Sequence, residues 1–446
     1  MSIRHSARVL IVLLVFGLGF LAPDVSAQQA DRSETSTPAP QQGSTEEEMT
    51  TEQRLRILEE QVRQQRSAAR GLLSSFNPKI SLSLLGSAAV FSEPDNLNLG
   101  HHDPKVRGFN LQNGELFFSG AVDPYFQLEG FVAMVIEGGA TVIELEELFA
   151  TSTALPANLQ LVVGQYFTRF GRHNRLHPHR WDFADQPVIL NRLFGPDGLR
   201  GPGMQLSWLA PTPFYLEFIG SAQQAQGEIA TSFLSEAGET VRGYTLIERG
   251  VRKIDDLLYM PRVVTSLNPT DAVTVALGGS ALFGPNASGM NNRTAIYGAD
   301  LYVKWKPVDH VKGFPFVGWQ TEYLFRDYEA GPDEANAIPA DRPKDFGLYS
   351  QIVYGFTYRW VAGFRVDYAN STGGAAAAPF LTTLAQRDLV GERWRFSPNL
   401  TFYPSEFTKL RLQYNLDVAD SRGREAVHGA FLQVEFNIGE HAAHVF

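Results

Sequence analysis

Residues 408–417 read TKLRLQYNLD, and this stretch decides the fold class. Apolar side chains occupy every second position, and Lys409, Arg411, Gln413 and Asn415 fill the positions between them. Successive side chains of a β-strand point to opposite faces, so the stretch predicts a strand with one apolar and one polar face. An alternation over about ten residues is typical of a strand that crosses an outer membrane, although a soluble β-sandwich also alternates.

The same alternation returns from residue 79 to residue 438 and predicts about 16 strands. We expect them near 79–91, 107–122, 125–137, 142–152, 158–168, 203–210, 213–222, 258–267, 271–283, 293–306, 314–327, 345–356, 359–369, 392–403, 407–417 and 428–438. Every second connection is short or contains Pro, the others are mostly longer, and only 138–141 breaks this rule. Short periplasmic turns and long outer loops favour an all-β fold, a transmembrane antiparallel β-barrel.

The composition excludes several other classes of protein. Aromatic residues make up 12% of the 446 residues and gather beside the short turns, as interface girdles would. The chain has no Cys, which excludes disulfides and thiol catalysis, and its formal net charge of −10 argues against a nucleic-acid partner. The sequence contains no G-x-S-x-G, P-loop or H-E-x-x-H motif, so we expect no enzyme and no cofactor.

The N-terminal region divides into three predicted segments before a barrel at 77–446. Residues 1–27 have the basic start, apolar run and Val-Ser-Ala cleavage site of a signal peptide, and 28–50 predict a disordered linker. Residues 51–76 predict a periplasmic helix or coiled coil that would hold a homotrimer together, with a solvated amphipathic helix as the alternative. The candidate trimerisation residues are Arg54, Leu55, Leu58, Glu59 and Val62.

The polar face of the later strands is mainly basic. The candidate lumen residues are Arg326, Arg365, Arg393, Arg395, Lys409 and Arg411. A basic lining attracts anions, although a polar lumen needs charges of some sign for solvation alone.

The third long connection, residues 169–202, is both basic and apolar. Its large apolar side chains, such as Trp181 and Leu190, suit a loop folded inward against the barrel wall. The candidate pore-constriction residues are Arg169, Arg172, Arg175 and Arg180. His177, His179 and Asp182 are a candidate metal site, because imidazole and carboxylate suit zinc, but their spacing is not specific and a structural role is the alternative.

The chain resembles the phosphate-selective porin-like group of 16-stranded trimeric porins. The likeness rests on the signal peptide, the short coiled segment, and the stretch from GQYF at 164–167 to FGR at 170–172. The chain is still more similar to outer-membrane barrel proteins labelled zinc-regulated or TonB-dependent receptors, through HPHRWDF at 177–183 and the HAAHVF tail at 441–446. A TonB-dependent receptor needs a large plug domain inside about 22 strands, for which the N-terminal region is too short.

These observations predict a porin of the bacterial outer membrane. It would pass small hydrophilic solutes passively, with a preference for anions, and its other partner would be outer-membrane lipid. Phosphate specificity is not expected, because the lumen relies more on Arg than on Lys. Two alternatives stay open: an uptake channel or receptor for a metal such as zinc or its chelate, and an adhesin or structural barrel.

Overall fold

The structure is a computed structural model that describes residues 78–94, 97–137 and 139–439. The predicted signal peptide, linker and trimerisation helix lie outside these residues, as does the tail at 441–446. Among the described residues, no helix has the length and apolar character needed to cross a membrane.

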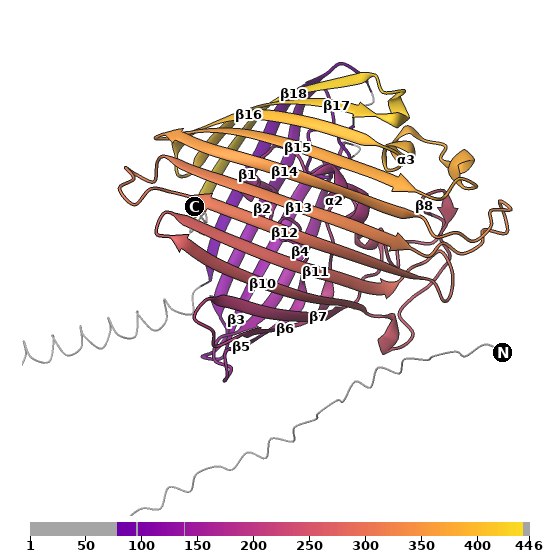
Figure 1. Cartoon of the computed structure of the whole chain (residues 1–446), viewed down its shortest axis with the longest axis horizontal. Coiled ribbons are helices and arrows are strands. Elements are labelled where there is room, and N and C mark those ends of the chain that lie inside the picture. The colour runs from indigo at the N-terminus through magenta and orange to yellow at the C-terminus, as the bar shows by residue number, and fades with distance from the viewer. Residues whose placement is uncertain (1–77, 95–96, 138, 440–446) are drawn as a thin grey trace, which may run out of the picture. The chain divides into compact units, whose positions relative to one another are not determined.

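Sixteen antiparallel strands close into a barrel, as the alternation predicts (Figure 1). Each strand pairs with the next along the chain, and β1 pairs with β18 to close the ring. The strands are β1 (Lys79–Phe91), β2 (Gly108–Ala121), β3 (Phe126–Glu137), β4 (Ala140–Ser152), β5 (Leu159–Phe167), β6 (Arg200–Leu209), β7 (Tyr215–Gln223), β10 (Leu258–Thr270), β11 (Val273–Pro285), β12 (Arg293–Trp305), β13 (Phe316–Tyr328), β14 (Lys344–Thr357), β15 (Trp360–Thr372), β16 (Arg393–Ser405), β17 (Thr408–Ala419) and β18 (Ala426–Gly439). All sixteen predicted strands are present.

The barrel wall is apolar outside and polar inside. On β17, Lys409, Arg411 and Gln413 are buried, whereas Leu412 and Tyr414 are 59% and 41% exposed. A water-soluble protein would place these side chains the other way round, so the exposed apolar faces require a lipid environment.

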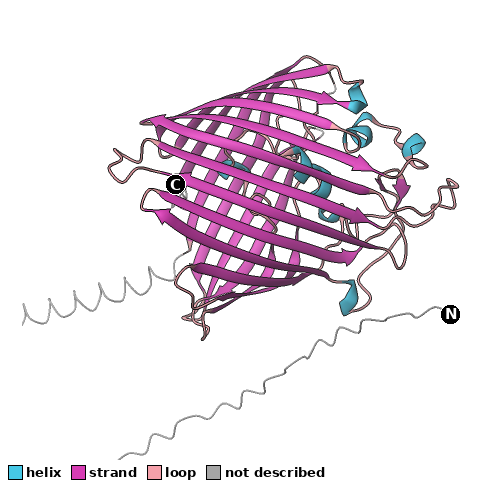
Figure 2. Cartoon of the chain, in the orientation of Figure 1, coloured by secondary structure: helices cyan, strands magenta, loops and turns pink. Residues whose placement is uncertain are grey.

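The two rims differ in the length of their connections, as Figure 2 shows. At the short-turn rim, β10 and β11 are separated by two residues, and so are β14 and β15. At the long-loop rim, the connection between β7 and β10 carries a two-stranded hairpin of β8 (Thr240–Val241) and β9 (Tyr244–Thr245). Tyr244 lies in one buried apolar cluster with Ala287 and Ile338 of other long loops and with Tyr328 at the end of β13, so these loops cover one another rather than extend separately.

Candidate functional site

The third loop runs through the inside of the barrel between the end of β5 and the start of β6. It contains the 3-10 helix η1 (Pro178–Arg180) and the helix α2 (Val188–Phe194), and every residue of α2 is buried. Contacts join α2 to β14 and β15, and Figure 2 shows the helix within the ring of strands. The inward fold expected from the loop's apolar content is what the structure shows.

Part of the inner wall is apolar where α2 packs. Leu190, Leu193 and Phe194 lie in one buried cluster with inward side chains such as Leu282 and Leu324 from the wall. Burial of each large apolar side chain contributes about 1.5–3 kcal/mol. The interior of the barrel therefore contains a hydrophobic core between α2 and the wall. The alternation pattern predicted a uniformly polar inner face and so did not predict this core.

Asp185 anchors the loop to the far side of the barrel. Its carboxylate lies 2.8 Å from the guanidinium of Arg365, forms an ion pair with Arg395, and accepts hydrogen bonds from Gln413 and Asn415. Burial would raise the pKa of Asp185, but the two guanidinium groups outweigh it and lower that pKa to about 2. One loop carboxylate thus connects strands β15, β16 and β17.

The other predicted lumen cations are also buried and bonded. Arg326 pairs with Asp345, Arg393 with Asp417, and Lys409 with Glu435. Lys409 and Arg411 also donate to the backbone carbonyls of His179 and Trp181 in the third loop. These wall cations are buried inside the barrel, where they pair with neighbouring carboxylates or bond to the third loop.

A glycine makes the first turn of the loop possible. Gly171 has a φ of +60°, and a Cβ there would lie 2.0 Å from an oxygen of Glu322. That carboxylate accepts hydrogen bonds from the backbone N–H groups of Arg172 and His173, at 2.9 and 2.8 Å. The turn therefore needs a residue with no side chain, so that Glu322 can approach the backbone.

The four arginines of the predicted constriction keep access to water. Arg175 is exposed, and Arg169, Arg172 and Arg180 are half-buried. Arg169 pairs with Glu217 at 3.2 Å and Arg172 lies over the ring of Tyr302, but within the described part of the chain Arg172, Arg175 and Arg180 form no ion pair. Although the side chain of Arg175 reaches water, the barrel wall around it removes part of its hydration and lowers its pKa to about 10. The positive charges of Arg169 and Arg172 add to this effect. These groups form a positive cluster on the loop surface.

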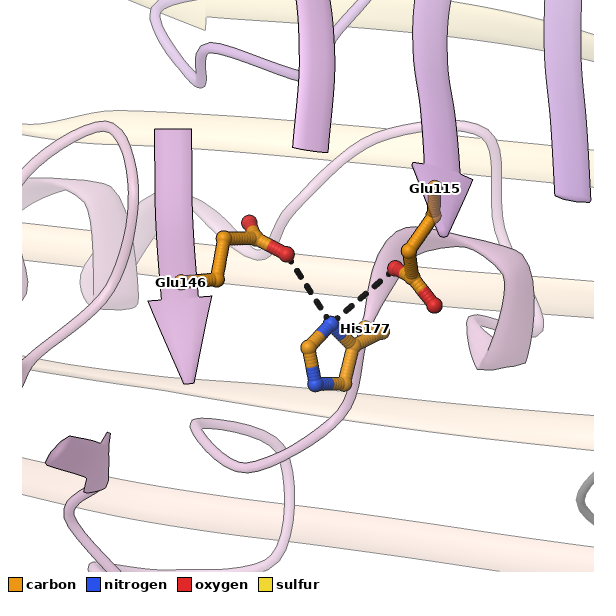
Figure 3. Close-up of side chains that lie close together, drawn as sticks. All are labelled: Glu115, Glu146 and His177. Carbon is orange, nitrogen blue, oxygen red and sulfur yellow. Dashed lines mark hydrogen bonds and ion pairs between the residues drawn. The ribbon is translucent and has the colours of Figure 1, made fainter. Parts of the chain in front are cut away.

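A second cluster joins the loop to β2 and β4 through histidines and carboxylates. His177 Nδ1 lies 3.1 Å from Glu115 and 3.1 Å from Glu146 (Figure 3). The other ring nitrogen, Nε2, lies 2.8 Å from Glu147. Burial opposes a charge on His177, but attraction to Glu115 and hydrogen bonds to the three carboxylates hold its pKa well above the usual value. His179 Nδ1 lies 3.2 Å from Glu115.

A β-bulge explains why two consecutive residues of β4 point inward. The register between β3 and β4 shifts at Phe131 and Val132, so Glu147 faces Phe131, Leu145 faces Val132, and Glu146 has no direct partner. The extra residue turns both glutamates into the interior, where both are buried. Strict alternation would send them to opposite faces, so the sequence pattern did not identify them.

The structure brings together two of the three predicted metal ligands and separates the third from them. It brings His177 and His179 together with Glu115, but Asp182 lies elsewhere, where it accepts a hydrogen bond from Gln351. Glu115 and Glu146 were not predicted from the sequence. The two residues lie on strands far from the loop in the chain, and only the folded barrel brings them to His177.

No family model matches the sequence. An uncharacterised protein of Aquifex aeolicus (strain VF5) is 31% identical over 405 residues, which cover 83% of this chain and 80% of that protein. Among solved structures, the fold is similar to the outer membrane channel DcaP of Acinetobacter baumannii, with a TM-score of 0.54, 11% identity and coverage of 82% of this chain and 98% of that one. It is also similar to OprB of Pseudomonas putida, with a TM-score of 0.50, 12% identity and coverage of 83% and 96%.

The fold defines the class: a 16-stranded barrel of the porin type, which with its apolar exterior places the protein in the bacterial outer membrane. The chain belongs to the same family as the Aquifex protein.

Proposed function

We propose that the protein is a porin-type channel for small hydrophilic solutes, that the third loop narrows it, and that it favours anions. The observation that carries the proposal is the positive cluster of Arg169, Arg172, Arg175 and Arg180, which reaches water on a loop inside the barrel. Fixed positive charge at a narrow point attracts anions and raises the barrier for cations. The anion-selective porin from Comamonas acidovorans has a similar fold, with a TM-score of 0.50, 7% identity and coverage of 81% of this chain and 99% of that one.

The anion preference should depend on the loop rather than on the wall. The wall cations Arg326, Arg365, Arg395 and Lys409 are each paired with a carboxylate, which cancels most of their field. Among the described residues, the four constriction arginines have only one ion-pair partner, Glu217, which pairs with Arg169. Of the predicted lumen cations, only Arg411 has no carboxylate partner among the described residues, where it bonds to neutral acceptors. We therefore expect the loop to supply most of the unbalanced positive charge.

The test is the single-channel conductance of the purified protein in a planar bilayer, with the reversal potential measured under a KCl gradient. We expect a stable conductance with chloride preference. Arg172→Gln/Arg175→Gln/Arg180→Gln should reduce the chloride-to-potassium permeability ratio several-fold. The matched control is Arg342→Gln/Arg359→Gln/Arg424→Gln, which removes the same charge from connections between strands and should keep the ratio. In these connections Arg342 and Arg424 are exposed and Arg359 is half-buried. A barrel that does not conduct would refute the channel.

We also propose that the channel is a homotrimer, on the basis of the pattern at Arg54, Leu55, Leu58, Glu59 and Val62. Those residues lie outside the described part of the chain. The test is the mass of the detergent-solubilised full chain. Leu55→Ala/Leu58→Ala should shift it from trimer to monomer, and an unchanged trimer would show that the predicted helix is not needed.

A further inference from the structure

We propose that Glu115, Glu146 and His177 bind one first-row transition-metal dication, which ties the third loop to β2 and β4. This goes beyond the proposed channel and does not depend on it. The three residues come from three separate elements, and Figure 3 shows both carboxylates directed at one nitrogen of His177. One ligand atom from each residue lies within 4.8 Å of the other two, and all three side chains are buried.

The hydrogen bonding of His177 requires a cation at its Nδ1. Its shortest contact, 2.8 Å, joins Nε2 to Glu147, and a neutral imidazole that donates there carries a lone pair on Nδ1. That lone pair would face two carboxylate oxygens at 3.1 Å. Three electron-rich atoms at this distance repel one another unless a positive ion lies between them, either a proton or a metal.

The distances suit a metal. A tetrahedral Zn²⁺ with ligands at about 2.0–2.1 Å places neighbouring ligand atoms about 3.3 Å apart. The two contacts of Nδ1 at 3.1 Å are close to that spacing. These two spacings need only a small widening to admit the ion, whereas a single proton on Nδ1 would have to be shared between the two oxygens in a bifurcated hydrogen bond.

Each proposed ligand also has an orienting partner. His179 Nδ1 lies 3.2 Å from the second oxygen of Glu115, and His102 Nε2 lies 3.3 Å from the second oxygen of Glu146. Glu147 holds His177 through the ring nitrogen that faces away from the other two ligands. Such outer partners fix the rotamers of metal ligands and commonly accompany metal-bound histidine.

The ligand set selects the class of metal. One imidazole nitrogen with two carboxylate oxygens suits Zn²⁺, Fe²⁺ or Co²⁺, whereas Ca²⁺ requires more oxygen ligands and Mg²⁺ an octahedral shell with several waters. A cavity of about 10 Å³, which is room for about one water molecule, borders Glu146 and His102 but not Glu115 or His177.

The experiment uses Co²⁺, whose visible absorption reports its coordination, and Zn²⁺ as a competitor. Because the site is buried, the full chain is refolded in detergent with and without metal. We expect one Co²⁺ per chain with a spectrum of nitrogen and oxygen ligands, displaced by Zn²⁺. His177→Ala and Glu146→Gln should each weaken binding at least 100-fold. His310→Ala removes an exposed histidine of a short turn and should change nothing.

Two readouts keep the test independent of folding and of conductance. Circular dichroism verifies that each variant retains its β-barrel, and Glu146→Gln keeps the size and shape of the side chain. Hydrogen exchange of residues 176–181 should slow when Zn²⁺ is bound to the wild type but not to His177→Ala. Absence of stoichiometric Co²⁺ binding, or equal binding by wild type and both variants, would overturn the proposal and assign the position at Nδ1 to a proton.

Discussion

Replacement of Asp185 by Asn should release the third loop from the barrel wall. Asn keeps the size of the side chain but removes the charge that faces Arg365 and Arg395. Both guanidinium groups are almost fully buried, so each would lose its shared carboxylate in a place that water does not reach. Arg365 keeps Asp367 and Arg395 keeps Asp417, which limits the damage to the loop and spares the wall.

The magnitude follows from the burial of the pair. Breaking one partner of a buried ion pair costs about 3–5 kcal/mol. At about 1.4 kcal/mol for each factor of ten, the equilibrium between docked and open loop should shift toward the open form by roughly a hundredfold to a few thousandfold. This change affects the local opening of the loop rather than the unfolding of the barrel.

Hydrogen exchange measures that local opening directly. Amides of α2 are protected in part by the wall, since Val188 N–H donates to Asp367 at 3.0 Å. In Asp185→Asn they should exchange at least about a hundredfold faster, while those of the strands keep their rates. The control is Asp255→Asn, which breaks an exposed pair with Lys253 that contributes about 0–1 kcal/mol. An exchange rate in α2 within tenfold of wild type would refute the reasoning.

Three further predictions concern the same loop. Folding lowers the pKa of Asp185 to about 2, so the stabilisation from its charge is present above the pKa near 4 of the unfolded chain and is lost as the pH falls toward 2. The hydrogen-exchange rate of the α2 amides, corrected for its intrinsic pH dependence, should therefore stay constant from pH 7 to about pH 5 and rise below about pH 4. Gly171→Ala should destabilise the protein by about 1–3 kcal/mol more than Gly423→Ala in thermal unfolding, because both have a similar positive φ but only Gly171 would meet Glu322; equal effects would contradict the clash. Leu193→Ala should cost about 2–5 kcal/mol in the docking of α2, seen as faster loop proteolysis, whereas the lipid-facing Leu412→Ala should leave the rate of loop cleavage unchanged.

The strands could be predicted because alternation is a local property. The stretch at 408–417 contains its own evidence, and the short turns between strands mark the ends. The inward fold of the third loop was also within reach, since Trp181 and Leu190 are too apolar for a loop in water. Both inferences need only neighbouring residues.

The bonding inside the barrel could not be predicted in the same way. Arg365 and Arg395 read as free lumen charges until the structure places Asp185 between them. The role of Glu146 depends on a bulge that has no clear sequence signature, and on a histidine 31 residues further along the chain. The closure of the barrel decides which charged residues form ion pairs, and the alternation of apolar and polar residues contains no information about this pairing.

The anchors of Asp185 have a consequence for the order of assembly. The loop residue bonds to Arg365, Arg395, Gln413 and Asn415, which follow it by 180 to 230 positions in the chain. The loop is therefore synthesised and exported long before its binding partners exist, and contacts at such separation form late. The last strands therefore do two things at once. They close the barrel by pairing with β1, and they bind the third loop, whose apolar side chains remain exposed to water until then. A chain that stopped before β15 would lack both the pairing of β18 with β1 and the residues that bind Asp185. We expect cells to degrade such a chain rather than insert it into the membrane.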